Sequence, residues 1–187
     1  MQEDLKNALE TLKKGGVILY PTDTIWGIGC DSTNAHAVER IFRIKKRDDS
    51  RSMLILIDEA WRLADYIKEI PDIAMQLIEV TDKPLTIIYP GAKGISPNLI
   101  SKDGSIGIRV TSDEFCRKLI GSLNRPIVST SANFSGSPSP QNFSEISEEI
   151  VKSVNYVVKW RQMEIGKSKP SSIIKIGIRG EIEIIRK

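Results

Sequence analysis

Short apolar runs alternate with amphipathic helical patterns along this chain, and the alternation limits the folds that it can adopt. The runs at 17–20 and 53–57 have the length and composition of buried strands. Before the first run, Leu5, Ala8 and Leu12 recur at the spacing of one helix face. Strands that alternate with helices predict an α/β fold.

The alternation continues to the end of the chain, with no repeat and no second separable core, so we expect a single domain over 1–187. The last two strands flank the short turn 177–180, and that hairpin implies a mixed sheet. The glycine-bearing segment 22–31 is expected to be a loop or a bent strand. Helices are expected before Gly15, from about Asn34, and over 59–68, 71–80, 113–123 and 144–152; the other strands are expected at 85–89, 105–110, 127–130, 154–158, 173–176 and 182–185.

Composition excludes several classes of protein. The net charge is only +3, so an anion site must come from local clustering of cations and not from a basic tail. No apolar run approaches the ~20 residues that span a bilayer, and the N-terminus is too charged for a signal peptide. Cys30 and Cys116 have no CxxC spacing, which is typical of free thiols in a reducing compartment. We therefore expect a cytoplasmic protein that does not contact a membrane.

Two polar segments about eighty residues apart suit a phosphorylated ligand held beside a small polar one. Lys45, Lys46 and Arg47 end a helical pattern, and Arg51 follows before the next strand, so the loop can place several donors around a phosphate. The segment Ser129–Asn133 follows an apolar strand with compact hydroxyl and amide groups. The plainer interpretations are a solvated cation cluster that complements the helix dipole, and a polar turn.

Arg109 and the segment Tyr20–Gly27 are two further candidates for a binding site. Tyr20–Gly27 places hydroxyl groups just past the carboxyl end of a strand, where open α/β sheets bind ligands. Arg109 alternates with Ile108 and Val110, so its side chain should point away from the core into a cleft. The alternatives are an ordinary turn and a surface arginine on an edge strand. Asp23 either helps to hold a metal-bound nucleotide or caps the turn.

Neither a nucleophile with a paired base nor a GxxxxGK[ST] phosphate-binding loop is present in the sequence. One histidine, His36, and two distant cysteines do not make up a zinc site, and His36 is expected at the surface near a helix start. An enzyme built from these residues would work by positioning its substrates and neutralising their charge.

Five blocks of sequence, in chain order, carry a resemblance to one known family: Tyr20–Gly29, Lys45–Arg47, Pro84–Thr86 with Pro90–Gly91, Ile106–Val110, and Ser131–Gly136. With these blocks the chain resembles the YrdC-like threonylcarbamoyl-adenylate synthases. The resemblance implies a single α/β domain with a twisted mixed sheet, flanking helices and a basic concave cleft. It also implies a reaction that joins L-threonine, bicarbonate and ATP, with Mg²⁺, to give threonylcarbamoyl-AMP and pyrophosphate.

The resemblance implies partners and site residues as well. The product would serve the threonylcarbamoyladenosine modification of tRNA, through downstream transferase machinery, and tRNA or double-stranded RNA is an expected partner. No protein ligand to the metal is implied. By the family's motifs, the ATP-binding residues are Lys45, Arg47, Arg51, Ser105, Ser129, Asn133, Ser139 and Arg186, and the threonine-binding residues are Thr24, Arg109, Ser131 and Ser171.

The chain departs from the family pattern at four places. Asp48 stands where a proline is usual, Ser52-Met53 replaces Pro-Leu, and Pro170 replaces a glutamate. Leu56 stands where a threonine-contacting histidine is expected. Two other hypotheses remain at this point: a non-catalytic module that binds double-stranded RNA or tRNA, and a carbamoyl-adenylate domain like those of hydrogenase-maturation proteins.

Overall fold

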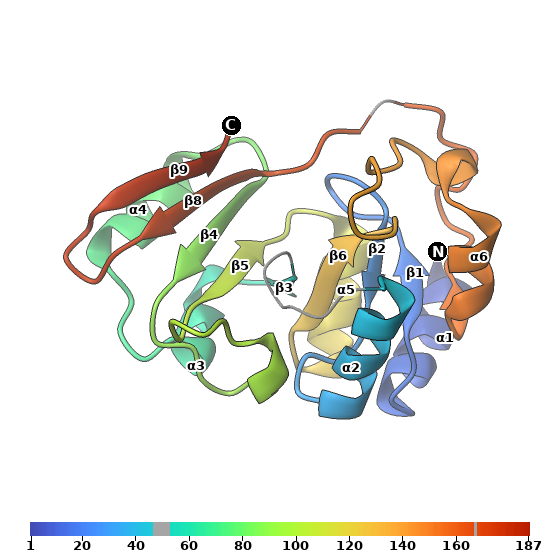
Figure 1. The fold of residues 1–187 in the computed structure, drawn as a ribbon, viewed down its shortest axis with the longest axis horizontal. Helices are drawn as coiled ribbons and strands as arrows, with labels where there is room; N and C mark the ends of the chain where they lie inside the picture. Colours follow the sequence, from blue (N-terminus) through green and yellow to red (C-terminus); the bar gives the residue numbers. More distant parts are fainter. Residues whose placement is uncertain (47–52, 167) are drawn as a thin grey trace.

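The computed structural model describes residues 1–46, 53–166 and 168–187. In these ranges the strands form one nine-stranded sheet in the order β7-β1-β2-β6-β3-β5-β4-β8-β9, flanked by helices (Figure 1). The predicted α/β class is therefore confirmed. The strands are β1 Ile18–Tyr20, β2 Gly27–Gly29, β3 Leu54–Ile57, β4 Leu85–Tyr89, β5 Ile106–Val110, β6 Ile127–Ser131, β7 Tyr156–Val157, β8 Ser172–Ile176 and β9 Ile182–Arg186.

Parallel and antiparallel pairs both occur in this sheet. β3 runs parallel to β5, β4 to β8, and β1 to β7. β2 lies antiparallel to β1 and to β6, and β8 and β9 form the antiparallel hairpin at one end of the sheet. The mixed sheet that this hairpin predicts is confirmed.

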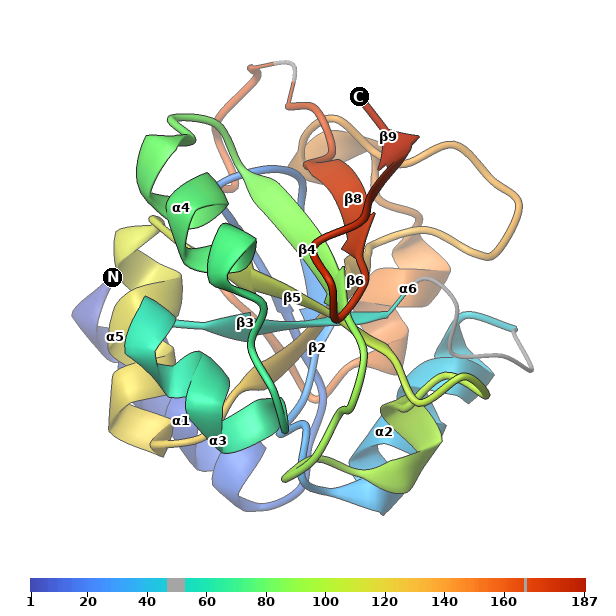
Figure 2. The ribbon, with the colours of Figure 1, turned by 90° about the vertical axis from the view of Figure 1, so that its left-hand side faces the viewer.

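Helices cover both faces of the sheet. Figure 2 shows α4 and α5 on one side and α2 and α6 on the other. The side chain of Asp113 caps α5 by accepting from the Cys116 N–H, and Asn34 caps α2 by accepting from the Ala37 N–H. The helices are α1 Gln2–Lys13, α2 Ala35–Ile44, α3 Leu63–Tyr66, α4 Asp72–Val80, α5 Glu114–Leu123 and α6 Glu148–Ser153, with 3-10 turns at Ala60–Arg62, Pro97–Leu99 and Phe143–Glu145.

The apolar core lies between the sheet and these helices. All of β1 and the Ile55–Ile57 part of β3 are buried on both faces, which explains why their sequences are continuously apolar and do not alternate. After β7 the chain crosses along the top of the molecule to reach β8 (Figure 1). Among the described residues, no helix is long and apolar enough to cross a membrane.

Several expected elements differ in detail. The helix expected over 59–68 is a 3-10 turn followed by the short α3, and the one expected over 144–152 is a 3-10 turn followed by α6. The segment 22–31 contains the strand β2. Glycine weakens a strand pattern in the sequence, but here Gly27 and Gly29 let the backbone of β2 approach its neighbours closely.

Gly29 supplies a test of that close approach. A Cβ atom at Gly29 would collide with the carbonyl oxygen of Val128 and lie 2.7 Å from the Tyr20 ring. We expect Gly29→Ala to lower the free energy of unfolding by roughly 1–3 kcal/mol, because neither neighbour has room to move in a packed sheet. Urea denaturation measures the loss, and Gly166→Ala, where a Cβ meets nothing within 4 Å, is the control. An unchanged midpoint for Gly29→Ala would contradict the packing described for β2.

Candidate functional site

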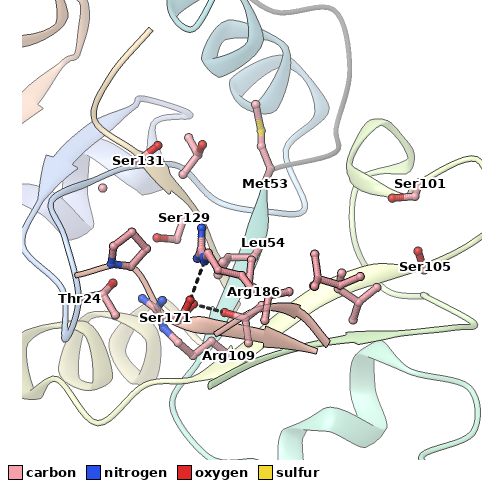
Figure 3. Close-up of a pocket in the computed structure, with 18 of the residues that line it drawn as sticks. Thr24, Met53, Leu54, Ser101, Ser105, Arg109, Ser129, Ser131, Ser171 and Arg186 are labelled. Carbon is pink, nitrogen blue, oxygen red and sulfur yellow. Dashed lines mark hydrogen bonds between the residues drawn. The ribbon is translucent and has the colours of Figure 1, made fainter. Parts of the chain in front are cut away.

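A cleft of about 1210 Å³ opens beside α2. Strands β2 to β6 line it together with α2, the loop around 98–105, and the β8–β9 hairpin. Figure 3 shows hydroxyl groups and guanidinium groups from distant parts of the chain meeting in this space. The lining residues carry both signs of charge, Glu39 and Asp103 as well as Arg43 and Lys102, so the expected basic character of the cleft stays a prediction.

Most residues predicted for the two substrates line this one cleft. Those on the threonine side are Thr24, Arg109, Ser131 and Ser171, and those on the nucleotide side are Ser105, Ser129, Ser139 and Arg186. Lys45 and Asn133 do not line it. Arg47 and Arg51, like the departures at Asp48 and Ser52, lie outside the described residues. The separate roles given to these residues remain predictions.

Lys45 is not at a solvated helix end, so the plainer interpretation, a solvated cation cluster, is wrong for this residue. The residue is 2% exposed, and its Nζ donates hydrogen bonds to the carbonyl oxygens of Ser131, at 2.6 Å, and Asn133, at 2.8 Å. The N–H of Ser135 in turn donates to the Lys45 carbonyl at 3.1 Å. The loop after β6 packs onto the last turn of α2, and its carbonyl groups replace water around the ammonium. Lys45 therefore ties the two polar segments of the sequence together.

Arg109 points from β5 into the cleft, as the alternation predicts. Gly107, two residues before it, lines the same cleft, whereas Ile108 and Val110 line a small cavity of about 110 Å³ on the other face. The guanidinium is almost fully buried, and its Nη2 lies 3.0 Å from Oδ1 of Asp23. Its Nε is buried without a hydrogen-bond partner among the described residues. A buried donor of this kind is rare in folded proteins, and within the same ranges Oδ1 of Asp23 is likewise without a hydrogen bond, so the two side chains are held together by their opposite charges.

Arg186 brings a second guanidinium close to Arg109. Its Nε donates to the carbonyl oxygen of Ser171 at 2.9 Å, and the Ser171 hydroxyl lies 2.8 Å from that of Thr86 (Figure 3). Burial and the Arg109 charge lower the pKa of Arg186 from its ordinary value. Two neighbouring cations repel each other, so an anion placed beside them is stabilised.

The outer rim of the cleft contains an ion pair that the sequence did not reveal. Lys175 on β8 donates to Asp103 Oδ2 at 2.7 Å, and the Ser105 hydroxyl donates to Asp103 Oδ1 at 2.6 Å. The hydrogen bonds from Lys175 and Ser105 lower the pKa of Asp103 to about 2. Ser105, predicted for ATP, is thus held by a carboxylate. The sequence signal for this ion pair was weak: Lys175 is a single charged residue in the apolar run 173–176.

Leu56 occupies the place of the expected histidine. It is fully buried in β3, directly opposite Arg109 in the register of the sheet. An apolar side chain there offers no hydrogen bond, so any polar recognition near Arg109 comes from other side chains, such as Thr24.

A sequence model of the Sua5/yciO/yrdC family, described as "Telomere recombination", matches residues 10–187. The chain belongs to this family. A protein of Pseudoalteromonas translucida named "Threonylcarbamoyl-AMP synthase" is 30% identical, and the match covers 97% of this chain and 97% of that protein. The family resemblance seen in the five sequence blocks is confirmed.

Solved structures of the family have the same fold. E. coli YciO superposes with a TM-score of 0.85 at 28% identity, covering 100% of this chain and 90% of that chain. The structure named "Crystal structure of P. abyssi Sua5 complexed with L-threonine" gives a TM-score of 0.80 at 28% identity. That match covers 92% of this chain and 50% of the P. abyssi chain, so the present chain spans half the length of that Sua5.

Proposed function

We propose that this protein is an L-threonylcarbamoyladenylate synthase. The observation that carries the proposal is the convergence, in one cleft, of the hydroxyl groups and arginines predicted for an amino acid and for a nucleotide. The family membership and the P. translucida relative's name support the same reaction. The P. abyssi Sua5 complex supports L-threonine as the amino acid.

The reaction needs charge neutralisation more than a covalent nucleophile. The amine of threonine bonds to the carbon of bicarbonate, and water leaves, which gives an N-carboxylated threonine. An oxygen of the new carboxylate then attacks the α-phosphorus of ATP, and pyrophosphate leaves. Both steps gather anions in one place, so the arginines that line the cleft, Arg109 and Arg186, would offset the accumulated negative charge.

ATP would bring Mg²⁺ on its phosphates. The described residues contain no group of three or more histidine, cysteine, aspartate or glutamate side chains that could hold a metal ion. Mg²⁺ in such a site is typically bound by substrate phosphates and water with few protein ligands. The metal therefore fits as a companion of the nucleotide, and its chemistry would be to offset phosphate charge.

The reaction itself is the first test. We expect the purified protein to release pyrophosphate from ATP only when L-threonine, bicarbonate and Mg²⁺ are all present, and to incorporate labelled bicarbonate into an adenylate. Omitting each component in turn is the control. Pyrophosphate release at the same rate with and without threonine, or no release at all, would contradict the proposal.

The same assay separates the other hypotheses, since an RNA-binding module alone would release no pyrophosphate. The product would serve tRNA modification in the cytoplasm through a downstream transferase.

A further inference from the structure

The Asp23–Arg109 ion pair is a feature of the site that substrate contacts alone do not explain. The two side chains are 8% and 4% exposed, and their closest nitrogen and oxygen atoms lie 3.0 Å apart. Forming a buried ion pair costs free energy, because both charged groups lose their hydration. Burial raises the pKa of Asp23, and the charge of Arg109 opposes that rise.

Asp23 approaches Arg109 from outside the cleft. Arg109 lines the large cleft, but Asp23 does not; Asp23 lines the small cavity on the other face, with Ile108 and Val110. The carboxylate therefore approaches the guanidinium at Nη2 from the side of the small cavity, as an ion pair in which Asp23 Oδ1 has no hydrogen bond among the described residues. This geometry argues against Asp23 as a ligand of a nucleotide-bound metal in the cleft.

Asp23 itself stands on a firmly held turn. The Thr22 hydroxyl donates to the carbonyl of Ile25 at 2.8 Å and accepts from the Thr24 N–H at 3.0 Å. Arg161, from the segment that crosses the top of the molecule, donates to the Thr22 carbonyl at 3.2 Å. A turn fixed on both sides of Asp23 can hold the carboxylate, and through it the guanidinium, in one place.

A second arginine, Arg186, repels Arg109, and the charge of Asp23 opposes that repulsion. Arg186 lies close enough to Arg109 for their charges to interact, and repulsion favours separation of the two guanidinium groups. The charge of Asp23, 3.0 Å from Nη2, offsets part of that repulsion and so favours the position of Arg109 in the cleft. Lysine or a freely rotating arginine could not keep one edge of the fork turned toward a substrate carboxylate.

We propose that Asp23 is a positioning residue for the amino-acid substrate, which holds the Arg109 guanidinium at the cleft, where it meets the threonine carboxylate. This inference rests on the proposed function, and it adds a residue outside the cleft to the determinants of threonine affinity. Asp23 touches no substrate and acts through Arg109.

The test is Asp23→Asn, with Asp23→Ala as a second variant. Asparagine keeps an oxygen acceptor but loses the charge, whereas alanine loses both. We expect the KM for threonine to rise about tenfold in Asp23→Asn and further in Asp23→Ala, as for the loss of a charge-assisted contact. The kcat at saturating threonine and the KM for ATP should change much less. Calorimetric titration of L-threonine gives the same comparison without turnover.

A different role for Asp23 predicts the opposite change in threonine affinity. If Asp23 only reduced the positive charge of the site, both variants would bind threonine more tightly, and that result would overturn the proposal. Asp31→Asn is the matched control, because Asp31 is also a buried aspartate, paired with Arg125 at 2.6 Å, and lies outside the cleft. It should leave the KM for threonine unchanged.

A double-mutant cycle with Arg109→Ala separates positioning from a general structural role. If Asp23 acts through the guanidinium, Asp23→Asn should have almost no further effect on threonine affinity once Arg109 is alanine. An equal loss in both backgrounds would mean that Asp23 acts elsewhere. Unchanged threonine affinity in an active wild-type background would remove this inference alone, whereas an inactive wild type would remove the proposed function and the inference with it.

Discussion

Lys45→Met should destabilise the protein and reduce its activity together. Methionine keeps a long unbranched stem but removes the ammonium that the Ser131 and Asn133 carbonyl groups accept from. The Asn133 carbonyl would lose its Lys45 donor, whereas the Ser131 carbonyl still accepts from the Asn133 N–H at 2.9 Å, so we expect a loss of roughly 1–3 kcal/mol in the free energy of unfolding. The loop after β6 would then shift, and a displacement of about 1 Å at a reacting site can lower turnover ~10²-fold.

Thermal or urea denaturation measures the first effect, and pyrophosphate release measures the second. Lys152→Met is the control for stability, because Lys152 is 71% exposed, pairs with the exposed Glu148 and lies outside the cleft. It should cost no more than about 0.5 kcal/mol. A Lys45 variant with wild-type stability and no activity would instead favour the direct phosphate contact that the family resemblance implies.

The sequence predicted the fold well where patterns are local. The continuous apolar character of β1 and β3 and the helix starts near Asn34 and Asp113 depend on nearby residues, and the structure contains them as expected. β2 was harder to identify, because its glycines serve a close contact with β6 that the sequence does not display. The short turn 177–180 was enough to predict the antiparallel β8–β9 hairpin, and from it the mixed sheet.

The candidate site was predictable only in part, for a physical reason. Alternation along β5 gave the direction of Arg109, because strand geometry is local. The partners of a charged side chain are not local: Asp23 lies 86 residues before Arg109, and the loop that surrounds Lys45 lies about 86 residues after it. A helix-end lysine looks solvated in the sequence whether or not another segment covers it. Arg47 and Arg51 stay predictions, outside the described residues.

We expect Arg109→Lys to weaken threonine binding about tenfold or more while changing ATP affinity much less. The guanidinium pairs with Asp23 through Nη2, and the same side chain lines the cleft in which the substrate carboxylate would bind. A lysine ammonium is a single point donor at the end of a flexible stem, so it can satisfy Asp23 or the substrate carboxylate but not present a planar fork to both. Losing a charge-assisted hydrogen bond of this kind costs roughly 1.5–3 kcal/mol.

Calorimetric titration of L-threonine and of ATP into the wild type and Arg109→Lys decides the point. Arg109→Ala should weaken threonine binding further, because it also leaves the Asp23 carboxylate buried without its partner. Arg125→Lys is the matched control, since Arg125 also pairs with a buried aspartate but is 56% exposed and lies outside the cleft. Equal losses for threonine and ATP in Arg109→Lys would place Arg109 between the two substrates, and an unchanged threonine affinity would remove it from the amino-acid site.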